Sequence, residues 1–185
     1  MSRLLSSLPI SITDLETTGL RPDVHEIVEI GLLVIDQTSF EILDTFDVKV
    51  RPEHPERATK GALETNGYNP AQWSNAVTIE EAIREYGRKT ADTIFCSHNV
   101  TFDWSFTYEA FRKTGVENRM DYHRLDLFTM AWTLLKGTNI ERYNLNKVAA
   151  YFGLNEEPVP HRAINGATIA YEVFKRLIAL NSNQK

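Results

Sequence analysis

A nine-residue run from residue 27 to residue 35 constrains the fold more than any other segment. It reads Ile-Val-Glu-Ile-Gly-Leu-Leu-Val-Ile, which is too apolar for a strand that has one face in water. We therefore expect a central strand that is covered on both faces. The alternating segments 11–16 and 45–50 lie before and after it, across short turns. This arrangement predicts that the sheet begins as an antiparallel meander.

The rest of the chain alternates between helical and strand-like patterns. Thr78 and Glu81 form a predicted capping box, and a helix is expected to follow it. Further helices are expected over 57–66, 103–113, 128–135, 145–152 and 163–180. Two further strands are expected over 93–97 and 122–127. The last helix carries an apolar stripe made by residues 163, 167, 170, 174 and 177. A meander followed by such alternation predicts a layered α/β domain with a mixed sheet. A length of 185 residues fits a single domain over 1–185, with a core from about 10 to 180 and a short polar tail over 181–185.

Composition excludes several classes of protein. Twenty Lys and Arg residues against 25 Asp and Glu residues give a net charge of −5, which argues against a broad basic surface for nucleic acid. It leaves open a nucleic-acid enzyme whose positive charge is bound metal. Cys96 is the sole cysteine, so an internal disulfide and a cysteine-rich zinc site are excluded. With no apolar run of about 20 residues and no apolar signal-peptide core over 1–9, we expect a cytoplasmic protein without membrane contact.

Two carboxylates at the end of the first predicted strand are candidates for chemistry. Asp14 and Glu16 flank Leu15, and alternate strand residues point to the same face, so both carboxylates project together. Two like charges side by side are unfavourable unless a cation lies between them. Taken alone, however, an Asp-x-Glu pair is more simply explained as two solvated acids at a turn.

Two later segments hold further candidates. His98-Asn99-Val100-Thr101-Phe102-Asp103 follows a predicted buried strand and opens a helix, where an aspartate can equally serve to stabilise the helix dipole. His161 and Asn165 are four residues apart, which places them on one face at the start of the long helix. Gly166 costs about 1 kcal/mol relative to alanine inside a helix. This cost indicates that something approaches the backbone there, or that Asn165 needs room.

Taken together, the three segments resemble the three motifs of the DEDDh 3′–5′ exonucleases. This family of the ribonuclease-H-like superfamily includes the proofreading epsilon subunit of bacterial DNA polymerase III. The motifs occur in order from about residue 10 to residue 180, and the resemblance implies a three-layer fold with a five-stranded mixed sheet flanked by helices.

The last motif of the family reads His-x-Ala-x-x-Asp, and we take Asn165 as the counterpart of its final aspartate. The fourth carboxylate of the family would then be an amide in this chain. Two explanations stay open, an engineered near-isosteric replacement and a naturally weak or inactive variant. Either one implies reduced cleavage.

The resemblance also implies a mechanism. Two divalent cations, Mg²⁺ or Mn²⁺, would be held by Asp14, Glu16, Asp103 and Asn165, with Asp14 in contact with both ions. Glu16 and residue 165 would hold one cation and Asp103 the other. His161 would take the proton of the attacking water. The products would be nucleoside 5′-monophosphates, released from the 3′ end of a nucleic acid, with single-stranded DNA favoured over RNA as the substrate.

The resemblance further implies contacts to the terminal nucleotide, at Thr17, Thr18, Gly19, Leu20, Leu63, His98, Asn99 and Phe102. Leu20 or Leu63 would stack on the base, and a plain core role for Leu63 is equally consistent with the sequence. A different class of function is a nucleic-acid-binding module of the same fold that has lost catalysis. A small acidic binding protein without a nucleic-acid role would require three ordered motifs to be coincidence. The sequence leaves a polymerase partner open.

Overall fold

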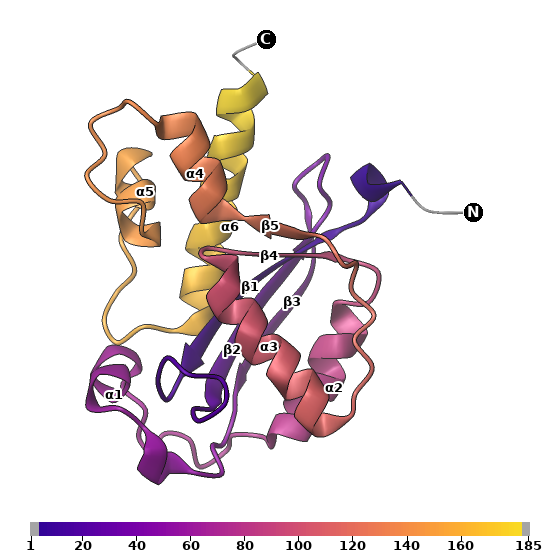
Figure 1. The fold of residues 1–185 in the computed structure, drawn as a ribbon, viewed down its shortest axis with the longest axis vertical. Coiled ribbons are helices and arrows are strands. Elements are labelled where there is room, and N and C mark those ends of the chain that lie inside the picture. The colour runs from indigo at the N-terminus through magenta and orange to yellow at the C-terminus, as the bar shows by residue number, and fades with distance from the viewer. Residues whose placement is uncertain (1–3, 183–185) are drawn as a thin grey trace.

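The computed structural model describes residues 4–182 and contains a five-stranded mixed sheet in the order β3-β2-β1-β4-β5 (Figure 1). The strands are β1 (Ile10–Thr17), β2 (Ile27–Ile35), β3 (Ile42–Lys49), β4 (Ile94–Ser97) and β5 (Arg124–Asp126). The first three strands pair antiparallel, and β4 and β5 then add in parallel on the other side of β1. The predicted meander and mixed sheet are confirmed. β2 is an interior strand as expected, although the middle position belongs to β1.

The helices are α1 (Lys60–Asn66), α2 (Ile79–Lys89), α3 (Val100–Thr114), α4 (Leu127–Leu135), α5 (Leu145–Tyr151) and α6 (Ala163–Ser182), with short 3-10 turns at Leu5–Ser7 and Pro55–Arg57. The capping box of Thr78 and Glu81 is present. Helix α3 begins three residues earlier than predicted, directly after Asn99, which adopts a left-handed conformation. Helix α6 continues through residue 182, so the predicted polar tail is helical at its start, and residues 183–185 lie outside the described residues. Within residues 4–182, no helix combines the length and the apolarity that a membrane crossing requires.

The sheet separates two apolar layers. On one face, β1 and β2 pack against α4, α5 and α6, and on the other they pack against α2 and α3 (Figure 1). The predicted stripe on α6 is buried at every position, with Ala163, Ala167, Ala170, Phe174 and Leu177 all 3% exposed or less. The three-layer arrangement is therefore confirmed.

The start of α6 sits unusually close to the sheet. Gly31 on β2 pairs with Asp14 on β1, and a methyl group at residue 31 would overlap the backbone of Ala163. Two residues earlier, Glu29 accepts a hydrogen bond from the amide of Ala163 at 3.1 Å. An acidic acceptor at a helix N-terminus satisfies a free amide and favours the helix dipole. These two residues of β2 therefore fix the beginning of α6 beside the middle of β1.

Candidate active site

An open cleft of about 630 Å³ lies beyond the carboxyl ends of β1 and β4. Its lining comes from the end of β1, from α1, from the starts of α3 and α5, and from the segment that leads into α6: residues 14–17, 19, 20, 59, 61, 62, 65, 66, 98, 102, 144–146, 157 and 161. The carboxyl ends of parallel strands are the usual ligand-binding edge of α/β sheets. The cleft thus gathers residues from both halves of the chain.

Asp14 and Glu16 lie on the same face of β1, as the alternation predicted. Leu15 belongs to the opposite apolar layer, and the hydroxyl of Thr13 lies 2.8 Å from that of Tyr86 on α2. Glu16 is only 8% exposed. Within the described chain, no hydrogen bond reaches the carboxylate of Asp14 or Glu16, although buried polar groups normally have such partners. The geometry leaves both carboxylates available for a cation.

The raised pKa values of the acids in this region also indicate a place for a cation. Burial raises the pKa of Asp14 well above its usual range, and the charges of Asp103 and Glu16 raise it further. Burial also raises the pKa of Glu16 to about 8, with the charge of Glu157 as the next largest cause. Asp103, on the first turn of α3, is 3% exposed, and burial raises its pKa to about 7. Crowded buried carboxylates of this kind favour protons or metal cations.

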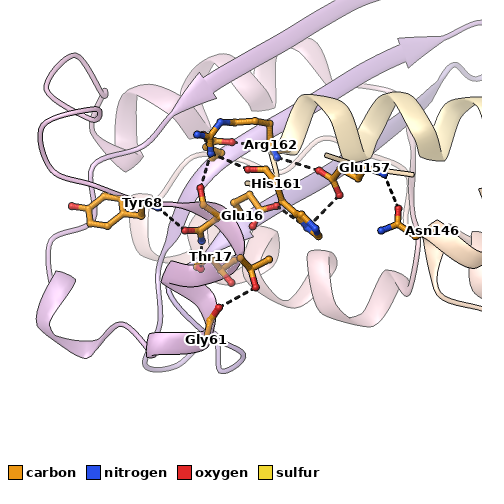
Figure 2. A network of polar contacts seen from close by, with 12 residues as sticks. Glu16, Thr17, Gly61, Tyr68, Asn146, Glu157, His161 and Arg162 are labelled. Atoms are coloured by element: carbon orange, nitrogen blue, oxygen red, sulfur yellow. Dashed lines mark hydrogen bonds and ion pairs between the residues drawn. The ribbon is translucent and has the colours of Figure 1, made fainter. Parts of the chain in front are cut away.

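The segment before α6 brings His161 to these acids. Its imidazole Nδ1 lies 3.3 Å from Glu157 Oε2 and 3.9 Å from Glu16 Oε1 (Figure 2). Its backbone amide donates to the carbonyl of Thr65 in α1 at 2.9 Å. The next residue, Arg162, donates to the carbonyl of Asn66 at 2.6 Å. His161 is therefore held between α1 and α6, facing the end of β1.

Helix α6 presents residue 166, not residue 165, to the acids of β1. A methyl group built at Gly166 would lie 2.6 Å from the carboxyl carbon of Asp14, and the next residue along a helix points about 100° away from its predecessor. The pattern His-x-Ala-x-x-Asp, counted from His161, also ends at residue 166. Our assignment of Asn165 as the counterpart of the fourth carboxylate is therefore wrong. That position is Gly166, where the close approach of Asp14 leaves little room for a side chain.

Five of the residues expected to contact substrate line the cleft, namely Thr17, Gly19, Leu20, His98 and Phe102. Leu20 is 79% exposed at its rim. His98 donates from Nε2 to the carbonyl of Tyr143 at 2.7 Å, since that carbonyl can only accept, and burial lowers the pKa of the ring. His98 therefore lines the cleft as an uncharged side chain.

The other three expected contacts are not among the lining residues. Thr18 is fully buried, and its amide, hydroxyl and carbonyl all bond within the protein, to Glu26 and Thr59. Asn99 is exposed at the start of α3, where its side chain accepts from the hydroxyl of Thr101. Leu63 is half-buried in α1. In this structure Thr18 therefore supports the loop after β1.

Asn66 and Glu157 also line the cleft, although the sequence did not predict either of them. The side-chain amide of Asn66 donates to the carbonyl of Thr17 at 2.9 Å and fixes the end of β1 against α1. Glu157 points into the cleft with its side chain only 7% exposed. Neither belongs to one of the three motifs, and Glu157 follows Glu156 in a proline-containing loop, which is typical of a solvated acid. No pattern in the sequence distinguished it.

Comparison with known proteins places these residues in context. The Exonuclease family (RNase_T) matches residues 11–174. The chain is 30% identical over 170 residues to the PolC-type DNA polymerase III of Thermotoga maritima, covering 91% of this chain and 12% of that protein. It is 27% identical over 173 residues to the DNA polymerase III epsilon subunit of Treponema pallidum, covering 92% of this chain and 77% of that subunit.

The fold also matches a solved structure. Escherichia coli exonuclease I in complex with a dT13 oligonucleotide superimposes with a TM-score of 0.79 at 16% identity, covering 96% of this chain and 42% of that one. The likeness at this identity concerns the fold. It confirms the ribonuclease-H-like architecture that the motif order implied.

Proposed function

Because this chain belongs to the exonuclease family (RNase_T), we propose that it removes nucleotides one at a time from the 3′ end of a nucleic acid and releases nucleoside 5′-monophosphates. The observation that carries the proposal is the pair of carboxylates at the end of β1, Asp14 and Glu16, which line the cleft and accept no hydrogen bond from the described residues. Glu16 is buried, and its Oε1 lies 3.9 Å from Nδ1 of His161. Single-stranded DNA is the favoured substrate, because two relatives are a PolC-type DNA polymerase III and a DNA polymerase III epsilon subunit, and the structural neighbour holds an oligo-dT strand.

In this proposal the acids at the end of β1 and on the first turn of α3 hold divalent cations. Asp14, Glu16 and Asp103 offer the hard oxygen ligands that Mg²⁺ and Mn²⁺ prefer. Divalent cations held there would supply Lewis-acid chemistry for the attacking water and for the departing 3′ oxygen. His161 accepts the proton of that water, since imidazole exchanges protons near neutral pH. Its backbone bond to Thr65 and its contact with Glu157 keep the ring facing Glu16.

The apolar rim of the cleft suits a terminal base. Leu20 and Phe102 both line it, and stacking on apolar or aromatic surfaces accepts every base. This property fits an enzyme that shortens a strand regardless of its sequence.

Gly166 favours a second candidate function, a module that binds single strands without cutting them. A glycine at this position removes one carboxylate from the family's ligand set. This candidate keeps the cleft and its rim but has no activated water.

The test is digestion of a 5′-labelled oligo-dT with Mg²⁺ or Mn²⁺, followed by separation of the products. The proposed function predicts a ladder of shortened strands and free dTMP, both absent with EDTA. Binding of the oligonucleotide without any ladder would instead support the binding module. A strand that is cut internally, or that is neither bound nor cut, would refute the exonuclease proposal. A matched oligo-U tests RNA in the same assay.

A further inference from the structure

We propose that Glu157 supplies the carboxylate that the chain lacks at residue 166, and that it binds the same divalent cation as Glu16. This inference rests on the metal-dependent function proposed above and assigns a ligand that lies outside all three motifs. Three separate features of the structure carry it: the gap at Gly166, the position of Glu157, and the way its loop is anchored.

The first feature is the absence of a carboxylate at residue 166. Asp14 approaches Gly166 so closely that a side chain at 166 would require the Asp14 carboxylate to move. The start of α6 is also held against β2 by the contact of Gly31 with Ala163. A fourth carboxylate therefore cannot project from residue 166 in this arrangement. A site with the family's number of acids needs one from elsewhere in the chain.

The second feature is the geometry around Glu157. Ligand atoms of Glu16, Glu157 and His161 all lie within 4.8 Å of one another. Octahedral ligands about 2.1 Å from a Mg²⁺ ion are separated by roughly 3 to 4.2 Å, so small adjustments would bring both carboxylates onto one cation. The charge of Glu157 acts on Glu16 more strongly than that of any other residue. Two carboxylates so close favour a proton or a cation between them.

The third feature is the anchoring of the loop. The backbone amide of Glu157 donates to the side chain of Asn146 in α5 at 3.1 Å. Its carboxylate Oε1 accepts from the amide of Arg162 at 3.1 Å. This bond fixes the orientation of the side chain and leaves Oε2 facing His161 and the cleft (Figure 2). A pre-oriented carboxylate of this kind is suited to a metal ligand.

Glu156 provides a matched comparison within the same loop. Its side chain is 56% exposed and lies 3.5 Å from Lys147. It carries the same charge one residue away from Glu157, but it does not line the cleft. A general effect of loop charge on metal binding would appear equally in both residues, whereas direct ligation would appear only in Glu157.

The experiment measures Mn²⁺ binding by calorimetry, without nucleic acid, for the wild-type chain, Glu157→Gln and Glu156→Gln. We expect Glu157→Gln to lose one Mn²⁺-binding event or to weaken it by at least about tenfold, while Glu156→Gln binds as the wild type does. Thermal unfolding in EDTA checks that both variants are folded. Glutamine keeps the shape of glutamate and can still accept from the amide of Arg162, so the variant separates charge from packing.

Equal Mn²⁺ affinity and stoichiometry in Glu157→Gln and wild type would overturn the inference, even if cleavage fell. Glu157 would then act on His161 alone, as a positioning residue. That result differs from failure of the proposed function, in which the wild-type chain itself would bind no Mn²⁺ and shorten no oligonucleotide. An equal loss in Glu156→Gln would also refute direct ligation, because it would show a general effect of charge.

Discussion

The two sides of the cleft differ in the kind of backbone that holds their functional side chains. On one side, Asp14 and Glu16 project from the middle strand of the sheet, where the pairing with β2 and the burial of Leu15 leave them no alternative orientation. On the other side, Glu157 and His161 lie in an irregular segment held by hydrogen bonds to α1 and α5. The strand side holds the acids that the resemblance to the family implies, whereas the loop and helix side has a glycine at residue 166, for which we propose that Glu157 substitutes.

This difference shows where a metal site can tolerate change. A residue on a buried strand can be replaced only by one that fits the same pleat, since a shift of one position turns its side chain to the other face. A segment without regular structure can offer a ligand from several positions. We therefore expect the strand acids to be indispensable and the loop side to be where the chain differs from its relatives.

Replacing Asp14 with asparagine should produce the largest effect. Cleavage should fall at least about 100-fold, the scale on which loss of one electrostatic contributor lowers turnover. The metal-free variant should be no less stable than wild type, because one of the crowded buried acids becomes neutral. Oligo-dT digestion and thermal unfolding in EDTA measure both effects.

The matched control for this variant is Asp47→Asn, which changes an exposed acid on the edge strand β3 opposite Gly31. It should leave cleavage unchanged. Cleavage by Asp14→Asn at near wild-type rates would show that the strand side is not the essential one.

A smaller effect should appear in the pH dependence of stability without metal. Burial raises the pKa of Glu16 in the folded chain to about 8. Between its unfolded value of about 4.5 and pH 8, the folded state therefore holds more protons than the unfolded state, and stability falls as the pH rises. In Glu16→Gln this contribution is absent. From pH 5.5 to 8.5 in EDTA, wild type should lose at least about 1 kcal/mol more than the variant, or about 2–4 °C in Tm.

Added Mg²⁺ should reverse this trend, because metal binds the deprotonated carboxylates. Its stabilising effect on wild type should be larger at pH 8 than at pH 6. Identical pH profiles of the Tm for wild type and Glu16→Gln in EDTA would contradict the assignment of Glu16 as a buried, crowded acid.

The sequence was sufficient to predict an element and the direction of its side chains wherever the spacing of apolar residues agrees with the burial pattern. The run 27–35 predicted β2 at its observed bounds, and the alternation of Asp14, Leu15 and Glu16 predicted which way each side chain points. Helix ends were predicted less well, because the left-handed conformation of Asn99 lets α3 start before Asp103.

The role of residue 166 was within reach of the sequence, because the pattern His-x-Ala-x-x-Asp counted from His161 ends there, whereas Glu157 was beyond sequence reasoning. The placement of Glu157 depends on its bonds to Asn146 and Arg162 and on its distance from His161, which none of the three motifs encodes. A pattern along the chain carries no measure of such a distance. The same is true of Thr18, whose polar groups are satisfied inside the protein by Glu26 and Thr59.

The smallest effect should come from Asn165→Asp, which restores an acid one residue before the position that faces Asp14. Successive helical residues point about 100° apart, so the new carboxylate would not share the direction of Gly166. We expect less than about a twofold change in oligo-dT cleavage and in Mn²⁺ affinity, within the range of surface substitutions. The same two assays on Glu157→Gln give the comparison. A tenfold gain in cleavage by Asn165→Asp would mean that α6 turns residue 165 into the cleft when metal binds. Glu157 would then be a neighbour of the site, and the loop side would follow the family pattern after all.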